Sequence, residues 1–175
     1  MNFFEQRDEA NWHFTIMDEE DLSHSVLQGG RIGTFFIEKS SARHAELAHL
    51  LQRYGDMFGQ HFKWGTWGEP VRQREYDPDK LAETVRWCRV KPPLHPVEYV
   101  WCSGADVDFV GDWEIQACAD SEPAEINWPS KPIGYLRFYF PVQLLKADGG
   151  AAFESWLLEC ATVLQPLNGY GGLGL

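Results

Sequence analysis

The sequence predicts an α+β domain in which helices pack against an antiparallel-rich sheet. Three segments repeat apolar residues at three- and four-residue steps, as amphipathic helices do. Several shorter apolar runs have the length of strands, and three of these follow one another with short connections, which favours antiparallel neighbours. The chain shows no internal repeat, linker or low-complexity segment, so we expect a single domain over residues 1–175.

The first part of the chain is expected to contain two strands and then a helix. The strands cover residues 12–17 and 32–38, with an acidic run and a Gly-Gly turn between them. Ser40 or Ser41 can cap the helix, in which leucines and aromatic residues recur on one face until Phe58.

Two further elements are expected before the middle of the chain. Residues 62–67 form a short strand with little apolar patterning. Asp77 and Pro78 predict the start of a second helix, because proline is favoured at the first helical position. The run from Lys91 to Pro93 ends this helix.

The second half of the chain predicts a three-stranded meander followed by a helix. The expected strands span residues 97–102, 113–119 and 133–140. Their connections are short enough for neighbouring antiparallel strands. The final helix places Phe153, Trp156, Leu157, Cys160 and Leu164 on one face.

The net charge of −11 is concentrated in two segments. Residues 1–25 hold seven acids and one base, and residues 104–128 hold seven acids and no base. The other 125 residues hold twelve acids and fourteen bases. Such a chain should repel nucleic acid and anionic membranes and attract a basic partner. Alternatively, both segments are solvated loops whose charge only aids solubility.

The aromatic content is high, with eight Trp, eleven Phe and six Tyr. Some of these side chains are expected in a surface patch, since Trp and Tyr are enriched at the centres of protein interfaces. The alternative is that all of them fill the core.

No motif predicts catalysis or metal binding. The segment that starts at Asp106 resembles the beginning of an EF-hand loop, but Val110 and Ala117 occupy positions that need oxygen ligands. His44 and His49 are five residues apart on one helix, so they point to different sides. We therefore expect no metal, no cofactor and no catalytic residue.

Cysteine spacing and hydropathy indicate an intracellular protein. Four cysteines lie apart without C-x-x-C spacing, and we expect buried, reduced thiols at Cys88, Cys102, Cys118 and Cys160. No apolar run approaches the ~20 residues that span a bilayer, and the N-terminus has neither the basic n-region nor the apolar h-region of a signal peptide. The expected compartment is the cytoplasm.

The C-terminal glycines spell G-x-G-x-x-G from Gly169 to Gly174, but no helix follows them as a dinucleotide site requires. We expect instead a bend at Pro166 and an irregular segment whose glycines can take positive φ. Tyr170, Leu173 and Leu175 could pack back onto the body.

This C-terminal segment resembles the TsiV-like type VI immunity family. The motif Leu-x-Pro-Leu-x-Gly-Tyr-x-Gly-Leu-Gly comprises Leu164, Pro166, Leu167, Gly169, Tyr170, Gly172, Leu173 and Gly174. A looser resemblance extends to residues 32–59, 79–89 and 133–140. Family members commonly continue beyond this motif, whereas the chain ends at Leu175, so both a short member and a shortened one are compatible with the resemblance.

The resemblance implies a cytoplasmic protein that neutralises a toxin delivered by the type VI secretion system. For TsiV-like proteins the implied toxin is a nuclease of restriction-endonuclease type. A nuclease needs a basic cleft for phosphate, which an inhibitor bearing carboxylates and aromatic side chains can occupy. Two alternatives stay open, namely an interaction or scaffold module with another partner, and a small-molecule enzyme or sensor.

The candidate partner-binding residues are carboxylates of the acidic segments and tryptophans. They are Asp18, Glu19, Glu20, Asp21, Trp64, Trp67, Asp106, Asp108, Asp112, Trp113, Asp120, Glu122 and Glu125. The two connections of the meander lie at opposite strand ends, so a contiguous patch would need the first acidic segment or Glu114. The expected partner is the effector protein, without nucleic acid or membrane, and a homo-oligomer is left open.

Overall fold

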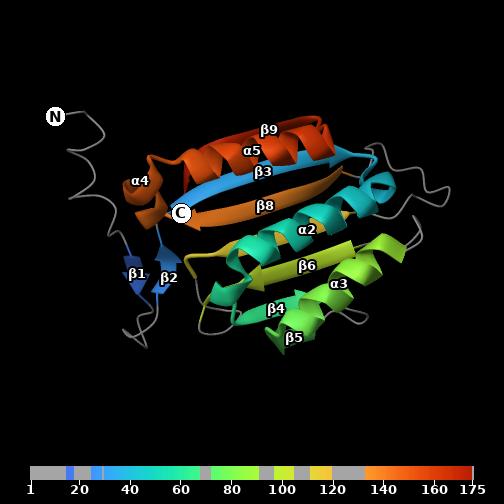
Figure 1. Ribbon diagram of the computed structural model, residues 1–175, viewed down its shortest axis with the longest axis horizontal. Helices are drawn as coiled ribbons and strands as arrows, with labels where there is room; N and C mark the ends of the chain where they lie inside the picture. Colours follow the sequence, from blue (N-terminus) through green and yellow to red (C-terminus); the bar gives the residue numbers. More distant parts are fainter. Residues whose placement is uncertain are drawn as a thin grey trace.

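The computed structural model describes residues 15–17, 25–28, 30–67, 72–90, 97–104, 111–119 and 133–174. Figure 1 shows an α+β arrangement, as the sequence predicts. The first elements are β1 (Thr15–Met17), β2 (Ser25–Gln28), β3 (Gly30–Glu38), the 3-10 turn η1 (Ser40–Arg43), α2 (His44–Phe58), the 3-10 turn η2 (Gly59–His61), β4 (Trp64–Trp67) and β5 (Arg72–Glu75). The remaining elements are α3 (Pro78–Val90), β6 (Val97–Cys102), β7 (Glu114–Ala119), β8 (Ile133–Pro141), α4 (Gln143–Asp148), α5 (Ala151–Leu164) and β9 (Asn168–Gly174).

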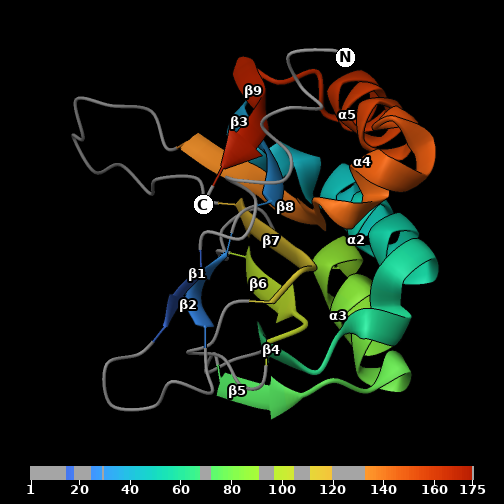
Figure 2. The same cartoon turned by 90° about the vertical axis from the view of Figure 1, so that its left-hand side faces the viewer.

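Seven strands form one antiparallel sheet in the order β5-β4-β6-β7-β8-β3-β9. The predicted meander of β6, β7 and β8 is confirmed. β3 comes from the early chain and inserts between β8 and β9, pairing with β8 over all nine of its residues. β1 and β2 pair separately as a two-stranded sheet. Figure 2 shows helices α2, α3, α4 and α5 on one side of the large sheet.

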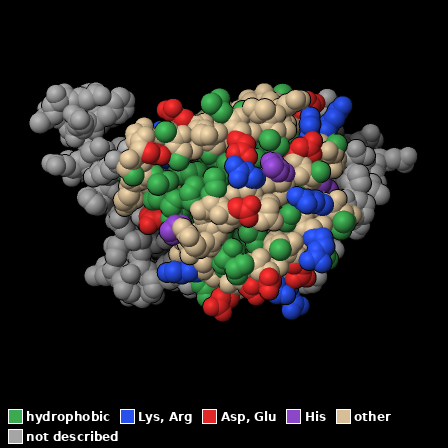
Figure 3. Space-filling model, in the orientation of Figure 1, with side chains coloured by type: hydrophobic (Ala, Val, Ile, Leu, Met, Phe, Trp, Pro, Cys, Tyr) green, Lys and Arg blue, Asp and Glu red, His purple; other side chains and the backbone are tan. Residues whose placement is uncertain are grey.

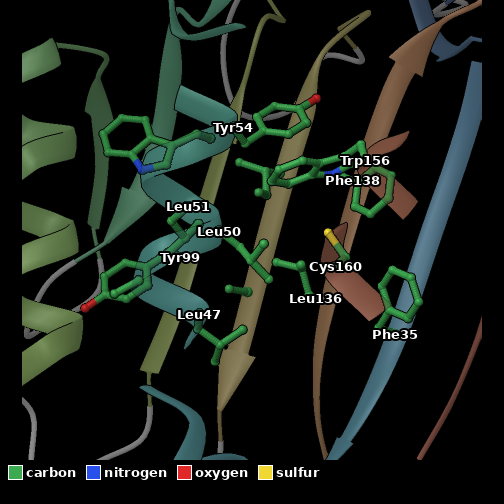
Figure 4. Packing of buried hydrophobic residues seen from close by; sticks show 14 of the residues in the cluster. Phe35, Leu47, Leu50, Leu51, Tyr54, Tyr99, Leu136, Phe138, Trp156 and Cys160 are labelled. Atoms are coloured by element: carbon green, nitrogen blue, oxygen red, sulfur yellow. The ribbon is translucent and has the colours of Figure 1, made fainter. Parts of the chain in front are cut away.

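The core lies between this sheet and the helices. Tyr54 of α2 is fully buried among aromatic rings, including Phe138 of β8 and Trp156 of α5. Figure 4 shows these rings pointing toward one another across the layer. Most of the described Trp and Phe side chains therefore serve the core, while several tyrosines lie elsewhere, as described below.

The prediction of a serine cap for α2 is wrong. Ser40 and Ser41 are buried in the 3-10 turn η1, and the helix starts at His44. Its N-cap position is Arg43, which makes no side-chain cap. The turn is closed instead by a backbone hydrogen bond from the N–H of Ala42 to a carbonyl three residues earlier.

The C-terminal glycine segment is a strand, not the irregular segment that the sequence predicts. β9 pairs with β3 over seven residues, and its glycines do not take positive φ. A Cβ at Gly169 would lie 2.5 Å from a ring atom of Phe35, and one at Gly171 would lie 2.8 Å from Leu157. These glycines therefore let β9 pass close to the core. Tyr170 is 55% exposed, and its ring packs onto the sheet beside Phe36 and not into the core.

Other differences are smaller. Strand β5, strand β2 and the short helix α4 are not anticipated by the sequence, and β7 begins at Glu114. All four cysteines are thiols, three of them buried and Cys118 half-buried. None of the described helices is long and apolar enough to span a membrane.

Candidate functional site

The two faces of the large sheet differ in what they carry. Buried and half-buried residues alternate along β7 and β8, because successive side chains of a strand point to opposite faces. The helix side holds the apolar core. We call the opposite side the far face. Its aromatic and charged side chains are Phe36, Glu38, Trp64, Glu75, Glu98, Glu114, Tyr135, Arg137, Tyr139 and Tyr170.

The strand register aligns these residues in rows across the far face. Trp64 is opposite Cys102, Cys102 is opposite Glu114, and Glu114 is opposite Tyr139. One row therefore runs from β4 to β8. Arg137 lies in the next row, at the middle of the sheet.

The far face is acidic. Among the described residues it carries four carboxylates, at Glu38, Glu75, Glu98 and Glu114, and one basic side chain, Arg137. Glu75 and Glu98 are exposed. This composition agrees with the acidic and aromatic surface that the sequence predicts, although most of its residues are different ones.

Arg137 is held in place by its neighbours. Its Nη2 donates a hydrogen bond to Glu114 Oε1 at 3.1 Å, and the guanidinium carbon lies 5.6 Å from the centre of the Tyr139 ring. The side chain keeps 38% of its surface exposed. A planar cation that a carboxylate and an aromatic ring already hold in place loses little conformational entropy on binding.

Tyrosines flank this pair. Burial is the main cause that raises the pKa of Tyr135 and the pKa of Tyr139, so both phenols stay neutral at physiological pH. At the β9 edge the Tyr170 ring lies 6.3 Å from the ring of Phe36. Such side chains offer apolar surface together with a hydroxyl that can donate or accept a hydrogen bond.

A second aromatic cluster lies at the end of the sheet where β7 begins, on the helix side. The Trp113 ring stacks on Phe58 at 4.3 Å and on exposed His61 at 4.7 Å, the latter at an interplanar angle of 4°. Trp113 itself is only 8% exposed, so it supports this cluster from within. Asp112 beside it is exposed. Figure 3 shows that hydrophobic side chains also gather on the helix side, left of centre.

The base of the β6–β7 connection is closed by two hydrogen bonds. The Trp113 N–H donates to Ser103 Oγ at 3.0 Å, and the Ser103 N–H donates to the Trp113 carbonyl at 2.9 Å. The segment between them, residues 105–110, lies outside the described residues and contains two predicted site residues.

Four of the sequence-predicted site residues are described at least in part. Trp64 lies on the far face, whereas Trp113 points to the helix side at the same end of the sheet. Asp112 is next to Trp113, and for Trp67 only the backbone is described, at the end of β4. The remaining candidates lie outside the described residues, namely Asp18, Glu19, Glu20, Asp21, Asp106, Asp108, Asp120, Glu122 and Glu125.

The anchors of the acidic segments are nevertheless placed. In the sequence the first run lies between β1 and β2, and the β6–β7 connection leaves the large sheet at the end where β3 begins. The segment after Ala119 leaves at the other end. Sequence reasoning missed Glu75, Glu98 and the far-face tyrosines. The alternation Tyr135, Arg137, Tyr139 in an apolar strand is the signal that could have indicated them.

An enzyme site is not suggested by the described residues. They contain no group of three or more potential metal ligands. A pocket of about 420 Å³ between β5 and α3 is lined by Arg74, Glu75, Tyr76, Asp77, Pro78 and Lys80. Acids and bases are mixed there, and among its titratable groups the pKa of Tyr76 is raised, chiefly by burial.

Comparison with known proteins gives a family match and a structural match. Residues 46–175 match the model of a family named TsiV, described as type VI immunity for VRR-NUC. Among solved structures, the T6SS protein PA0821 of Pseudomonas aeruginosa is similar with a TM-score of 0.72 and 16% identity over 86% of this chain. That match covers 42% of the PA0821 chain, so the chain spans less than half of its length. At this identity the likeness shows the fold alone. No curated protein sequence matches the chain.

Proposed function

The chain belongs to the TsiV family of type VI immunity proteins, and from this premise we propose that it binds one cognate type VI effector, a nuclease, and blocks it by occlusion. The observation that carries the proposal is the family match over residues 46–175. The choice of a nuclease rests on the family's description, which names VRR-NUC as the target of its immunity.

The charge of the molecule supports a nuclease as the partner. A nuclease active site must attract phosphate, so its cleft is basic. The chain carries a net charge of −11, and its acids cluster instead of spreading evenly. Complementary charge of this kind raises association rates up to ~10⁸–10⁹ M⁻¹s⁻¹ at low salt and has a smaller effect on affinity. Rapid binding matters for an antidote.

The sequence-predicted acids are part of this proposal. Asp108 is three residues from Gly111, so its Cα lies within about 11 Å of the Gly111 Cα. We propose that Asp106 and Asp108 act at the end of the sheet that also presents exposed Asp112. The run Asp18–Asp21 follows β1 in the sequence and precedes β2 and β3. We propose that both runs steer the effector toward this part of a single domain.

Occlusion requires no catalysis by the immunity protein. One protein occupies one toxin, so calorimetry should give a stoichiometry of one to one. A standard interface for such a pair buries on the order of 1,600 Å² in total, with a few aromatic or charged residues carrying most of the energy.

The test is binding between this protein and the effector encoded beside it. Calorimetry at two salt concentrations should show tight binding that weakens as salt screens the charges. A nuclease assay with increasing amounts of the protein should reach complete inhibition at one equivalent. Binding without inhibition would indicate a scaffold module, and absence of binding at micromolar concentration would overturn the proposal.

A further inference from the structure

We propose that the far face of the seven-stranded sheet is the docking surface, and that it takes the basic, nucleic-acid-binding face of the effector. This inference rests on the proposed function and specifies where the interface lies. The inference depends most on four far-face residues, Glu75, Glu98, Arg137 and Tyr170. None of them belongs to the sequence-predicted set.

Charge complementarity favours the far face over the helix side. The far face combines four carboxylates with one arginine among the described residues, and that arginine is already paired with Glu114. Helices α2, α3 and α5 carry six acids and four bases. Several of these form pairs, such as Arg53 with Glu159 and Lys80 with Glu83. Figure 3 shows the two signs interspersed on that side.

The side chains between the carboxylates are of the kind that anchors interfaces. Hot spots are enriched in Trp, Tyr and Arg and lie near the centre of the contact. Arg137 has this central position, with Tyr135 and Tyr139 beside it on its own strand. Tyr170 lies toward the β9 edge, and Trp64 lies on the other side of the face.

Two polar atoms at this centre point to a ligand. Thr34 is 4% exposed, and its Oγ1 has no hydrogen-bond partner among the described residues. It lies directly opposite Arg137, whose Nε also lacks a partner in this part of the structure. Buried polar groups in native proteins are usually satisfied. Both atoms are buried in the free protein, so an acceptor from the effector reaches them only if the Arg137 side chain rotates on binding.

The far face has the size that an interface needs. Strands lie about 4.8 Å apart and rise about 3.3 Å per residue. The five strands from β6 to β9, with the span from Ile32 to Glu38, therefore cover about 19 Å by 20 Å, and the four-residue strands β4 and β5 add about 10 Å by 10 Å, on the order of 500 Å² in plan. Side chains that stand out of this plane add to the accessible area. A standard interface takes about 800 Å² from each partner.

The test compares matched variants of the two sides of the molecule. The far-face variant is Glu75→Lys with Glu98→Lys, and the control on the helix side is Asp56→Lys with Glu154→Lys. All four residues are exposed, and both variants change the net charge equally. The far-face variant should weaken binding to the effector about 100-fold at low salt, and the control less than about threefold. Circular dichroism and Tm should be unchanged in both.

A second pair of variants leaves the charge constant. Tyr170→Ser removes an aromatic side chain that is 55% exposed on the far face, and Leu158→Ser removes an aliphatic side chain that is 69% exposed on α5. We expect the dissociation constant to rise about tenfold for the tyrosine variant. For the leucine variant it should change less than about twofold.

The identity of the occupant is tested by competition. A DNA duplex should displace the immunity protein from a catalytically inactive effector, because both need the same basic face. If the wild type binds and inhibits but both far-face variants behave like their controls, the docking surface is wrong while the proposed function stands. If the far-face variants lose binding to the effector but DNA does not compete with the wild type, the protein binds a different face of the effector. That result overturns this part of the inference. If the wild type itself does not bind, both proposals fail.

Discussion

Tyr54 connects helix α2 to the centre of the sheet. Its ring contacts Phe58, Phe62, Phe140 and other aromatic side chains, and its hydroxyl donates a hydrogen bond to the Tyr139 carbonyl at 2.5 Å. Complete burial is the main reason that the pKa of Tyr54 lies well above its usual value. The phenol is therefore a neutral donor, and it supports from the core side the same strand segment whose side chains face the effector in our proposal.

Replacing Tyr54 by Phe should destabilise the protein. The ring contacts remain, but the Tyr139 carbonyl loses its side-chain donor inside the core, which costs about 1–3 kcal/mol. Urea denaturation measures this as a lower midpoint with an unchanged slope. Tyr170→Phe is the control, because that hydroxyl belongs to an exposed side chain, and it should change stability by less than about 0.5 kcal/mol. Equal effects of the two substitutions would contradict this role of Tyr54.

At the scale of the element, β4 depends on a glycine. Gly65 lies between the two expected tryptophan anchors, in register with Trp101 of β6. A Cβ at this position would overlap the Trp101 ring and the carbonyl oxygen of Val100. The backbone oxygen cannot move without breaking the β4–β6 pairing, so only glycine fits here.

Gly65→Ala should therefore cost about 1–3 kcal/mol and loosen β4 and β5 from the sheet. Gly172→Ala on β9 is the matched control, since a Cβ there meets nothing within 4 Å. It should change stability by less than about 0.5 kcal/mol. Thermal unfolding of both variants, together with hydrogen exchange of β4 amides, checks the expectation. A neutral Gly65→Ala would show that β4 can shift away from β6 without penalty.

At the scale of the whole molecule, the placement of charge decides how the effector is approached. The described helices carry mixed charge, the far face is acidic, and the β6–β7 connection, which contains Asp106 and Asp108, leaves the sheet at the end where β3 begins. A basic partner would experience a field directed toward that end and that face.

Neutralising the acidic runs should slow association. Changing the four acids of Asp18–Asp21 to their amides, or likewise Asp106, Asp108 and Asp112, should reduce the association rate at low salt more than twofold. Stopped-flow mixing with the effector measures this rate. The control changes three exposed or half-exposed helix acids, Asp56, Glu83 and Glu154, to amides. If neither acidic set alters the rate by a factor of two, charge steering is not part of the mechanism.

Much of the fold could be predicted from the sequence because its signals are local. The 3.6-residue periodicity of α2 and α5 and the proline that opens α3 predict three helices within a few residues of their observed limits. Short connections predict the β6-β7-β8 meander. Of the predicted partner-binding residues, Trp64 lies on the far face, and its role in binding stays a prediction. Family membership was also indicated by the C-terminal motif, which the family match confirms.

Contacts between distant residues could not be predicted from local sequence patterns. The sequence 168–174 contains glycines that suggest an irregular segment, yet β3 offers it an edge to pair with, and the missing side chains let it lie against Phe35 and Leu157. The register between strands decides which residues share the far face. These strands can be far apart in the sequence, as for Thr34 opposite Arg137. Local patterns predict single helices and strands, because periodicity and short-range hydrogen bonds lie within one segment. The sheet order, the covered face and the site follow from long-range pairing and burial, which no single segment encodes.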